Sequence, residues 1–223
     1  MNQSGHRVLL IGAGGLGCAA GLALAQAGIP HLTIADPDRI ALSNLHRQIL
    51  YTTRTIDLLK VEQAAVQLKT INPLLSVTPV NQKLTTPEAI GLIAQHHAVT
   101  LDASDNFTTR FAANDAAIRY RFPLIHGAAT GFMGQLLTID PGRTACLRCL
   151  FGGPPATEGA TCQNEGVIGP LVGEVGWLMA LETVKLLHHR GQPAWNRLLT
   201  IHALTGQRRA VPLRPNPRCP CHS

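Results

Sequence analysis

The chain is poor in aromatic residues and in long apolar runs, and each shortage excludes a class of function. Two Trp and two Tyr among 223 residues are too few for a platform that stacks nucleic-acid bases. No apolar stretch approaches the ~20 residues that a membrane-spanning helix needs, and the short, polar Met1–Arg7 does not resemble a signal peptide. We therefore expect a cytoplasmic protein that binds neither nucleic acid nor membrane.

Charge is also scarce, at 14% of residues, against a hydrophobic content of 45%. This balance is typical of an ordered globular protein. The net charge of +6 is spread along the chain without a basic run, which favours a solvated surface and, second, an acidic protein partner. None of the ten histidines has HxxxH or HExxH spacing, so no histidine-based metal motif is indicated.

The first 126 residues alternate short apolar runs with segments of helical periodicity. Such alternation predicts a Rossmann-like, doubly wound and mostly parallel α/β sheet. The predicted strands are Val8–Ile11, His31–Ala35, Leu75–Val80, Ala98–Asp102 and Pro123–Ile125, and the predicted helices are Cys18–Ala27, Lys60–Leu68, Thr86–Gln95 and Thr109–Tyr120.

After Gly127 the pattern changes. Gln135–Ile139 and Leu198–Ala203 are predicted as antiparallel strands, with a long helix over Val172–Leu187 between them. Phe151–Gly166 is rich in Gly, Pro and small polar residues and is predicted to be a mobile crossover loop. We expect one domain over residues 1–223, with a nucleotide-binding half (1–126) and a second half (127–223).

A glycine-rich turn follows the first strand. Gly12, Gly14 and Gly17 match GxGxxG at the start of a helix, and Asp36 ends the second strand about twenty residues later. Glycines allow the backbone to approach phosphate, the helix start supplies N–H groups, and the acid can bind ribose hydroxyls. This fingerprint alone does not distinguish NAD from ATP.

The polar segment Ser43–Gln48 favours ATP over NAD as the bound nucleotide. It places Asn44 and Arg47 three residues apart, on one face if helical. Lys60 begins the next helix, and Asp105 follows the fourth strand at the sheet edge where ligands bind. Cations for phosphate oxygens and a carboxylate for Mg²⁺ are the minimum set for nucleotidyl transfer. Each residue taken singly could equally be a solvated surface group.

Six cysteines in a reducing compartment point to metal or reactive thiols rather than disulfides. Cys146 and Cys149 form a CxxC, and Cys219 and Cys221 form a second pair near the C-terminus, followed by His222. Two such pairs can close one tetrahedral zinc site and staple the tail to the body. A redox CxxC and an unmetallated site are the alternatives. Cys18, on the first helix, is predicted to be a packed core thiol.

Together these motifs resemble the ThiF/MoeB/HesA family, the bacterial relatives of ubiquitin-activating enzymes. The resemblance implies ATP- and Mg²⁺-dependent adenylation of the C-terminal glycine of a small ubiquitin-like sulfur-carrier protein, by a homodimer. It runs from about Val8 to the C-terminus and rests on GAGGLG, DPDRIALSNLHRQ, LLKVE, LDASDN, CLRC and TCQNEGVIGPLVGEVG.

The resemblance also implies roles for individual residues at the nucleotide. Gly15 would lie against the nucleotide and Asp36 would hold the ribose. Asp105 matches the Mg²⁺-binding aspartate, and Asn106 lies beside it in the region of adenine and ribose.

Three further residues, Asn44, Arg47 and Lys60, match the positions that contact the triphosphate. Arg47 would stabilise the charge that builds up as pyrophosphate leaves. The carrier's carboxylate is already a nucleophile, so the reaction needs positioning and charge stabilisation and no general base.

The cysteines have family counterparts as well. The family carries a structural zinc held by a CxxC in each half, whereas here the second half is Cys219-Pro220-Cys221. Cys219 and His222 have the family's spacing, so the fourth ligand is Cys221 or, in its place, His222. Cys162 matches a cysteine that can take part in carrier thiolation in some members; its alternative role is that of a spectator thiol.

The family's substrates differ, and QILYTT and GFMGQL resemble the ThiF branch, which implies a ThiS-like carrier and thiamine biosynthesis. The small subunit of molybdopterin synthase, a MoaD-like carrier, is the nearest alternative. An NAD-dependent oxidoreductase and a catalytically inactive carrier-binding module are alternatives of other classes. Family members usually begin with a helix carrying an RYxRQ-like motif, and its absence before the first strand would weaken ATP binding.

Overall fold

The protein is described by a computed structural model that covers residues 6–155 and 166–219. Three residues with predicted roles, Cys162, Cys221 and His222, lie outside these ranges, as does most of the predicted crossover loop. None of the helices in the described ranges is long and apolar enough to cross a membrane.

The described strands form an eight-stranded sheet in the order β3-β2-β1-β4-β5-β6-β7-β8. The first five are parallel, and the last three are added as antiparallel strands. This confirms the predicted Rossmann-like fold class. The strands are β1 Arg7–Ile11, β2 His31–Ala35, β3 Ser76–Val80, β4 Val99–Asp102, β5 Leu124–Thr130, β6 Met133–Ile139, β7 Arg197–His202 and β8 Gln207–Pro212.

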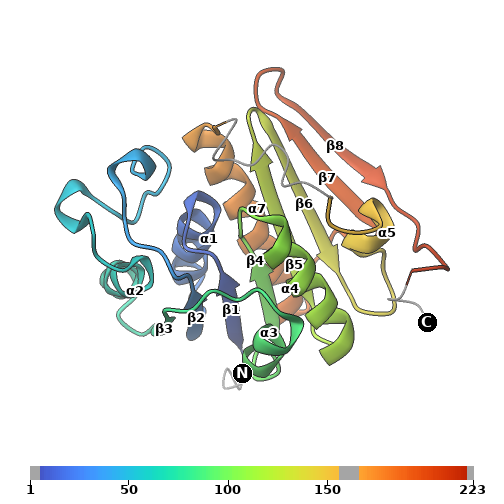
Figure 1. Cartoon of the computed structure of the whole chain (residues 1–223), viewed down its shortest axis with the longest axis horizontal. Helices are drawn as coiled ribbons and strands as arrows, with labels where there is room; N and C mark the ends of the chain where they lie inside the picture. Colours follow the sequence, from blue (N-terminus) through green and yellow to red (C-terminus); the bar gives the residue numbers. More distant parts are fainter. Residues whose placement is uncertain (1–5, 156–165, 220–223) are drawn as a thin grey trace.

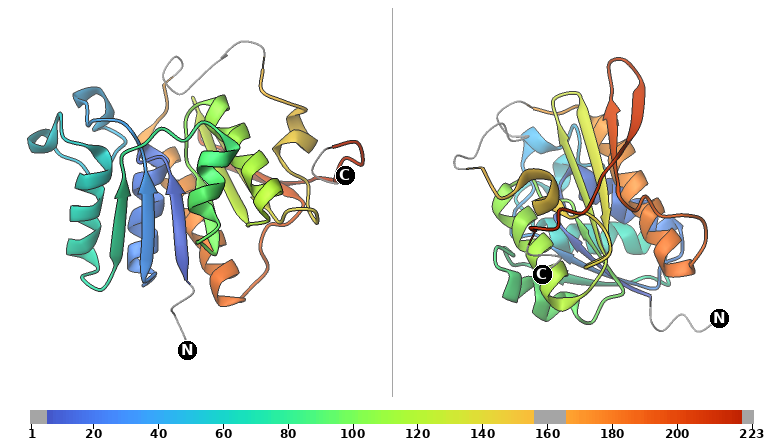
Figure 2. Two further views of the ribbon diagram at one scale, coloured as in Figure 1. Left: turned by 60° about the horizontal axis from the view of Figure 1, so that its bottom comes forward. Right: turned by 90° about the vertical axis from the view of Figure 1, so that its right-hand side faces the viewer.

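Helices cover both faces of this sheet (Figures 1 and 2). One face carries α1 (Gly15–Gln26), α2 (Lys60–Ile71) and α7 (Gly169–His188), with α1 packed directly against α7. The other face carries α3 (Pro87–Ala94), α4 (Phe107–Tyr120) and the short α5 (Leu147–Phe151). Each set of helices encloses its own cluster of buried apolar side chains, so the sheet separates two cores.

The sequence prediction missed three features of the second half. β5 continues to Thr130 instead of ending at Ile125, because its buried residues pair along their whole length with β6. β8 (QRRAVP) is exposed at every position and has no apolar alternation, so no periodic signal marks it. The five-residue α5, which contains Cys149 of the CxxC, is too short to show helical periodicity.

The structure supports a packed role for Cys18, which lies on α1 and is 1% exposed. Burial raises the pKa of its thiol to about 12. On the order of one thiol in ten thousand is then ionised at pH 8, and only the thiolate reacts with alkylating reagents. We expect iodoacetamide to leave Cys18 unmodified in the native protein and to modify it after unfolding in guanidinium chloride, as measured by peptide mass mapping. Equal labelling rates in both states would contradict its burial.

Candidate functional site

The glycine turn lies at the carboxyl ends of β1, β2 and β4. Gly12 donates a backbone hydrogen bond to Ala35 at 2.8 Å and has φ +99°, a conformation that favours glycine. A Cβ on Gly12 would lie 2.7 Å from the carbonyl oxygen of Ala103, and one on Gly17 would lie 2.0 Å from the carbonyl oxygen of Gly12. These two glycines therefore let strand, turn and helix pack at backbone distance.

The other two glycines of the turn differ from each other. Gly14 is the N-cap residue of α1, and a Cβ there would meet nothing closer than Gln48 Nε2 at 3.9 Å. A Cβ on Gly15 would lie 2.9 Å from Val172 Cγ2 and 3.2 Å from the carbonyl oxygen of Arg47. Gly15 thus allows α7 and the Arg47 segment to close on the start of α1.

Asp36 ties this turn to β2. Its carboxylate accepts hydrogen bonds from the backbone N–H of Ala13 at 2.7 Å and of Asp38 at 2.8 Å. Burial raises the pKa of the Asp36 carboxyl, and the nearby Lys60 opposes this effect. Lys60 is itself 5% exposed, with Nζ 2.7 Å from Asp38 Oδ2 and 4.0 Å from Asp36 Oδ1. The structure therefore brings both predicted residues together and adds Asp38, which the sequence analysis did not consider.

Asn44 and Arg47 share one hydrogen-bonded cluster, although only Asn44 belongs to a helix and Arg47 lies in the turn that follows it. Asn44 ends the short 3₁₀ helix Leu42–Asn44, and its Oδ1 accepts from Arg47 Nη2 at 3.0 Å and from Gln48 Nε2 at 3.1 Å. Gln48 is 2% exposed, and its Oε1 has no hydrogen-bond partner among the described residues. This amide was missed because a lone Gln after a cation gives no distinct sequence signal.

Tyr51 is a second residue that the sequence analysis missed. It is buried, and its hydroxyl lies 3.0 Å from the carbonyl oxygen of Ala13 and 3.2 Å from that of Lys60. The ring thereby links the glycine turn to the start of α2. A contact across 38 residues leaves no periodic trace in the sequence, so no local pattern could have identified it.

Asp105 and Asn106 lie between β4 and α4. Asp105 is exposed. Asn106 is the N-cap residue of α4, and its side chain accepts from the backbone N–H of Thr109 at 2.9 Å, so part of its hydrogen-bonding capacity serves the helix. The same loop contacts the glycine turn through Ala103 and Ser104.

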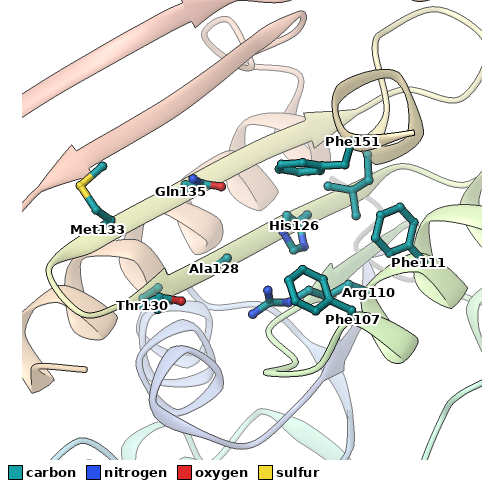
Figure 3. Close-up of a pocket in the computed structure, with 11 residues that line it drawn as sticks. Phe107, Arg110, Phe111, His126, Ala128, Thr130, Met133, Gln135 and Phe151 are labelled. Atoms are coloured by element: carbon teal, nitrogen blue, oxygen red, sulfur yellow. The ribbon is translucent and has the colours of Figure 1, made fainter. Parts of the chain in front are cut away.

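A cavity of about 220 Å³ lies on the other side of this loop, between α4, α5, β5 and β6 (Figure 3). Aromatic and aliphatic side chains form most of its wall, and Arg110, His126 and Gln135 are polar members. His126 on β5 pairs with Asp102, the last residue of β4, and β5 continues from there to Thr130. The cavity therefore runs beyond the carboxyl end of β4. The remaining lining residues are Phe107, Phe111, Ala128, Ala129, Thr130, Met133, Leu147 and Phe151.

A buried polar cluster lies under this cavity. Asp102 is fully buried, and its Oδ2 is 2.8 Å from His126 Nδ1. Its Oδ1 accepts from the backbone N–H of Ser104 at 3.1 Å and from Ser104 Oγ at 2.6 Å, while Arg110 donates to the carbonyl oxygen of Ser104 at 3.2 Å. Burial by itself raises the pKa of Asp102, but the bonds from His126 and Ser104 and the charge of Arg110 outweigh it and lower the pKa.

This lowered pKa predicts how Asp102 contributes to stability. Between its folded pKa and the usual value near 3.9, the folded protein keeps the carboxylate while the unfolded chain takes up a proton. The contribution is therefore complete above about pH 5 and is lost as pH falls through the folded pKa. We expect Asp102→Asn to lower the free energy of unfolding by about 1–3 kcal/mol at pH 7 and by less at pH 3.5, in urea titrations.

The exposed Asp57 provides a control for this measurement. Asp57→Asn should change the free energy of unfolding little at either pH. A cost of Asp102→Asn that stays constant or grows at pH 3.5 would contradict the lowered pKa.

Three of the predicted zinc ligands meet in space. Cys146 Sγ lies 3.9 Å from Cys149 Sγ and 3.7 Å from Cys219 Sγ, although Cys219 is 73 residues further along the chain. A tetrahedral zinc with Zn–S bonds near 2.3 Å requires sulfur atoms about 3.8 Å apart, so the three thiols fit this ion. The separations are far longer than the ~2.05 Å of a disulfide. The predicted fourth ligand, Cys221 or His222, lies outside the described residues.

The open sheet, the glycine turn at its carboxyl edge and the acid that follows β2 define an α/β protein of the Rossmann-like class, a class typical of nucleotide binding. The model of the ThiF family matches residues 2–221. The chain belongs to the ThiF family, which confirms the resemblance seen in its sequence motifs.

Individual relatives are adenylyltransferases. The molybdopterin-synthase adenylyltransferase of Escherichia coli is 42% identical over 96% of this chain and 85% of the relative. The sulfur carrier protein ThiS adenylyltransferase of the same organism is 41% identical over 96% and 84%. The sulfur carrier protein adenylyltransferase of Thermus thermophilus is 39% identical over 96% and 80%. The predicted enzyme class, a nucleotidyltransferase, is thereby confirmed.

Solved structures share the fold at lower identity. One crystal structure of E. coli MccB, in complex with MccA-N7isoASN, has a TM-score of 0.88 at 19% identity and covers 99% of this chain and 68% of that chain. The structure of MccB with ATP has a TM-score of 0.86 at 20% identity, over 97% and 67%. At this level of identity the likeness concerns the fold.

Proposed function

We propose that the protein uses ATP and Mg²⁺ to adenylate the C-terminal carboxylate of a small sulfur-carrier protein. The observation that carries this proposal is the cluster of Asn44, Arg47 and Gln48 beside the glycine turn, in a family whose relatives are named adenylyltransferases. A dehydrogenase has no use for such a cation, because hydride transfer builds up no phosphate charge. Pyrophosphate departure does build up such charge.

In the proposed reaction, ATP lies on one side of the Ala103–Asn106 loop and the carrier's C-terminal tail arrives from the other. The glycine turn holds the phosphates on one side, with Gly14 N-capping α1 and with Asp36 available to the ribose. An oxygen of the carrier's carboxylate attacks the α-phosphorus, and the bond from this phosphorus to the bridging oxygen of the β-phosphate breaks. Pyrophosphate leaves with that electron pair, and no proton transfer is required. Arg47 would stabilise its charge.

Lys60 and Asp105 complete the proposed phosphate site. Lys60 would shift from its ion pair with Asp38 to share its charge with the triphosphate, a movement for which the flexible lysine stem is suited. Asp105 offers a carboxylate for Mg²⁺, which would neutralise phosphate charge when bound. Asn106 would remain the helix cap while its amide faces the adenosine.

The cavity beyond the loop is the proposed entry for the carrier's C-terminal tail. Its walls are apolar, with few polar groups, and its volume of about 220 Å³ suits a narrow segment of small residues rather than a folded partner. GFMGQL, the motif that resembles the ThiF branch, supplies Met133 and Gln135 to this wall. We therefore propose a ThiS-like carrier and a role in thiamine biosynthesis as the specific function.

Pyrophosphate exchange with purified components tests the activity. We expect exchange of labelled pyrophosphate into ATP only when a sulfur carrier with an intact C-terminal glycine is present. Exchange that does not depend on the carrier, or its absence despite carrier binding, would overturn the proposal; the second result would indicate a binding module.

The same assay distinguishes the two carriers. The identities of 42% and 41% to the molybdopterin-synthase and ThiS enzymes favour neither substrate. With ThiS and with the small subunit of molybdopterin synthase compared at equal concentrations, the proposal expects a higher kcat/KM for ThiS. The reverse order would transfer the assignment to molybdopterin synthase.

Three accessory assignments complete the proposal: thiolation of the carrier through Cys162, a homodimer, and a cytoplasmic location. Cys162→Ser should leave pyrophosphate exchange intact and stop any covalent carrier adduct, which mass measurement of the intact protein would detect.

A further inference from the structure

We infer that His126 is a substrate-contacting residue, whose Nε2 binds a backbone N–H of the carrier tail in the cavity; this inference rests on the proposed function. Figure 3 shows the His126 ring in the middle of the cavity, among Phe107, Phe111 and Phe151 and close to Arg110. The glycine turn and the Arg47 cluster on the opposite side of the loop do not involve it.

A hydrogen bond to Asp102 orients the His126 ring. His126 is 4% exposed on β5, and its Nδ1 lies 2.8 Å from Asp102 Oδ2 on the neighbouring strand. A carboxylate only accepts hydrogen bonds, so Nδ1 carries the proton and donates. Asp102 is itself held from the other side by two bonds from Ser104. The ring is therefore held in a fixed position, with Nε2 as the nitrogen that is left for the cavity.

The other ring nitrogen, Nε2, is available to the cavity. In the form of the ring that carries its single proton on Nδ1, Nε2 is a hydrogen-bond acceptor. In the described part of the chain, Nε2 has no hydrogen-bond partner, although the residue lines the cavity. A peptide tail that enters an apolar channel must satisfy its own N–H groups there, because an unpaired buried N–H is costly.

Arg110, the charged neighbour of His126, offers the cavity a different kind of polar group. Arg110 uses Nε and Nη2 to donate to the carbonyl oxygen of Ser104 and has no acceptor atom, so it can bind a tail carbonyl or carboxylate but not an N–H. Gln135 projects from β6 on the opposite wall and offers both a donor and an acceptor. His126 and Arg110 are thus complementary polar groups for the two sides of a peptide unit.

Two substitutions at position 126 separate this role from a structural one. Glutamine places a polar atom near the position of Nε2 and loses the one near Nδ1, whereas asparagine keeps the bond to Asp102 and loses the atom that faces the cavity. We expect His126→Asn to raise the KM for the carrier about three- to tenfold with kcat and the KM for ATP little changed. We expect His126→Gln to keep most of the carrier affinity, although it lowers the thermal midpoint more than His126→Asn does.

The opposite ranking would overturn the inference, because it would show that the histidine acts only through Asp102. Equal carrier KM values in the wild type and both variants would overturn it as well. The exposed His96, whose ring nitrogen lies 3.5 Å from Gln95 Nε2, provides His96→Asn as a control that should change no kinetic constant. Failure of the wild-type protein to catalyse carrier-dependent exchange would instead refute the proposed function.

Discussion

Arg47→Ala is expected to lower carrier-dependent pyrophosphate exchange about 100- to 1,000-fold, the range found when a donor to developing transition-state charge is removed. The guanidinium is held by Asn44 Oδ1 at 3.0 Å and by the carbonyl oxygen of Ser43 at 3.4 Å, at the side of the glycine turn. Because the side chain is only partly buried, the free energy of unfolding should fall by about 1 kcal/mol or less. Exchange kinetics and urea unfolding measure the two effects.

Arg54→Ala is the matched control, since Arg54 is an exposed arginine in the nearby 3₁₀ helix Thr53–Thr55. It removes the same charge from the same region and should leave exchange within a factor of two or so. Arg47→Lys should recover only part of the rate, because a lysine cannot reproduce the planar fork of the guanidinium. Near-normal exchange in Arg47→Ala would refute the role assigned to this residue.

The second large effect concerns the cysteine cluster. We expect the native protein to hold about one zinc per chain, and Cys146→Ser to hold almost none. Cys146 is fully buried beside Cys219, so loss of the metal would release the C-terminal segment from α5 and leave polar atoms in the apolar core. A cost of about 3 kcal/mol would lower the thermal midpoint by roughly 6–12 °C. Metal analysis and calorimetry on the same samples test both parts.

Cys18→Ser distinguishes zinc loss from the cost of a buried hydroxyl. Cys18 is 1% exposed in the other core, so this variant should also lose stability but should keep its zinc. At the second pair, Cys221→Ser should weaken zinc binding more than His222→Gln; the reverse would make His222 the fourth ligand. A metal-free protein with an unchanged thermal midpoint would contradict the structural zinc.

Much of the nucleotide-binding half could be predicted because its signals are local. The boundaries of β2 agree with the predicted His31–Ala35, and α2 starts at Lys60 as predicted. Each of these elements has an apolar run or a helical stripe, and glycines or polar turns lie between them. The second half was harder, since β8 is solvent-exposed at every residue and is placed by its pairing with β7, a contact that leaves no apolar pattern in its sequence.

The candidate site also contains some residues that local motifs identify and others that only the tertiary structure brings together. The glycine turn, Asp36 and Arg47 have sequence motifs whose spacing reflects a single strand–turn–helix unit. Asp102 and His126 are neighbours only because β4 and β5 lie in register, and their 24-residue separation corresponds to no motif. The cavity has no sequence signature, because its wall combines side chains of α4, β5, β6 and α5 that only the tertiary packing brings together.

The sequence by itself determined the order of strands and helices in the nucleotide-binding half, the glycine turn and the identity of the family, because these depend on residue type and short spacing. Only the tertiary structure decided that Lys60 pairs with Asp38, that Cys219 meets Cys146, and that His126 faces a cavity with its Nδ1 held by Asp102. Such contacts join distant parts of the chain, and their distances are set by the packing of whole elements rather than by any local preference.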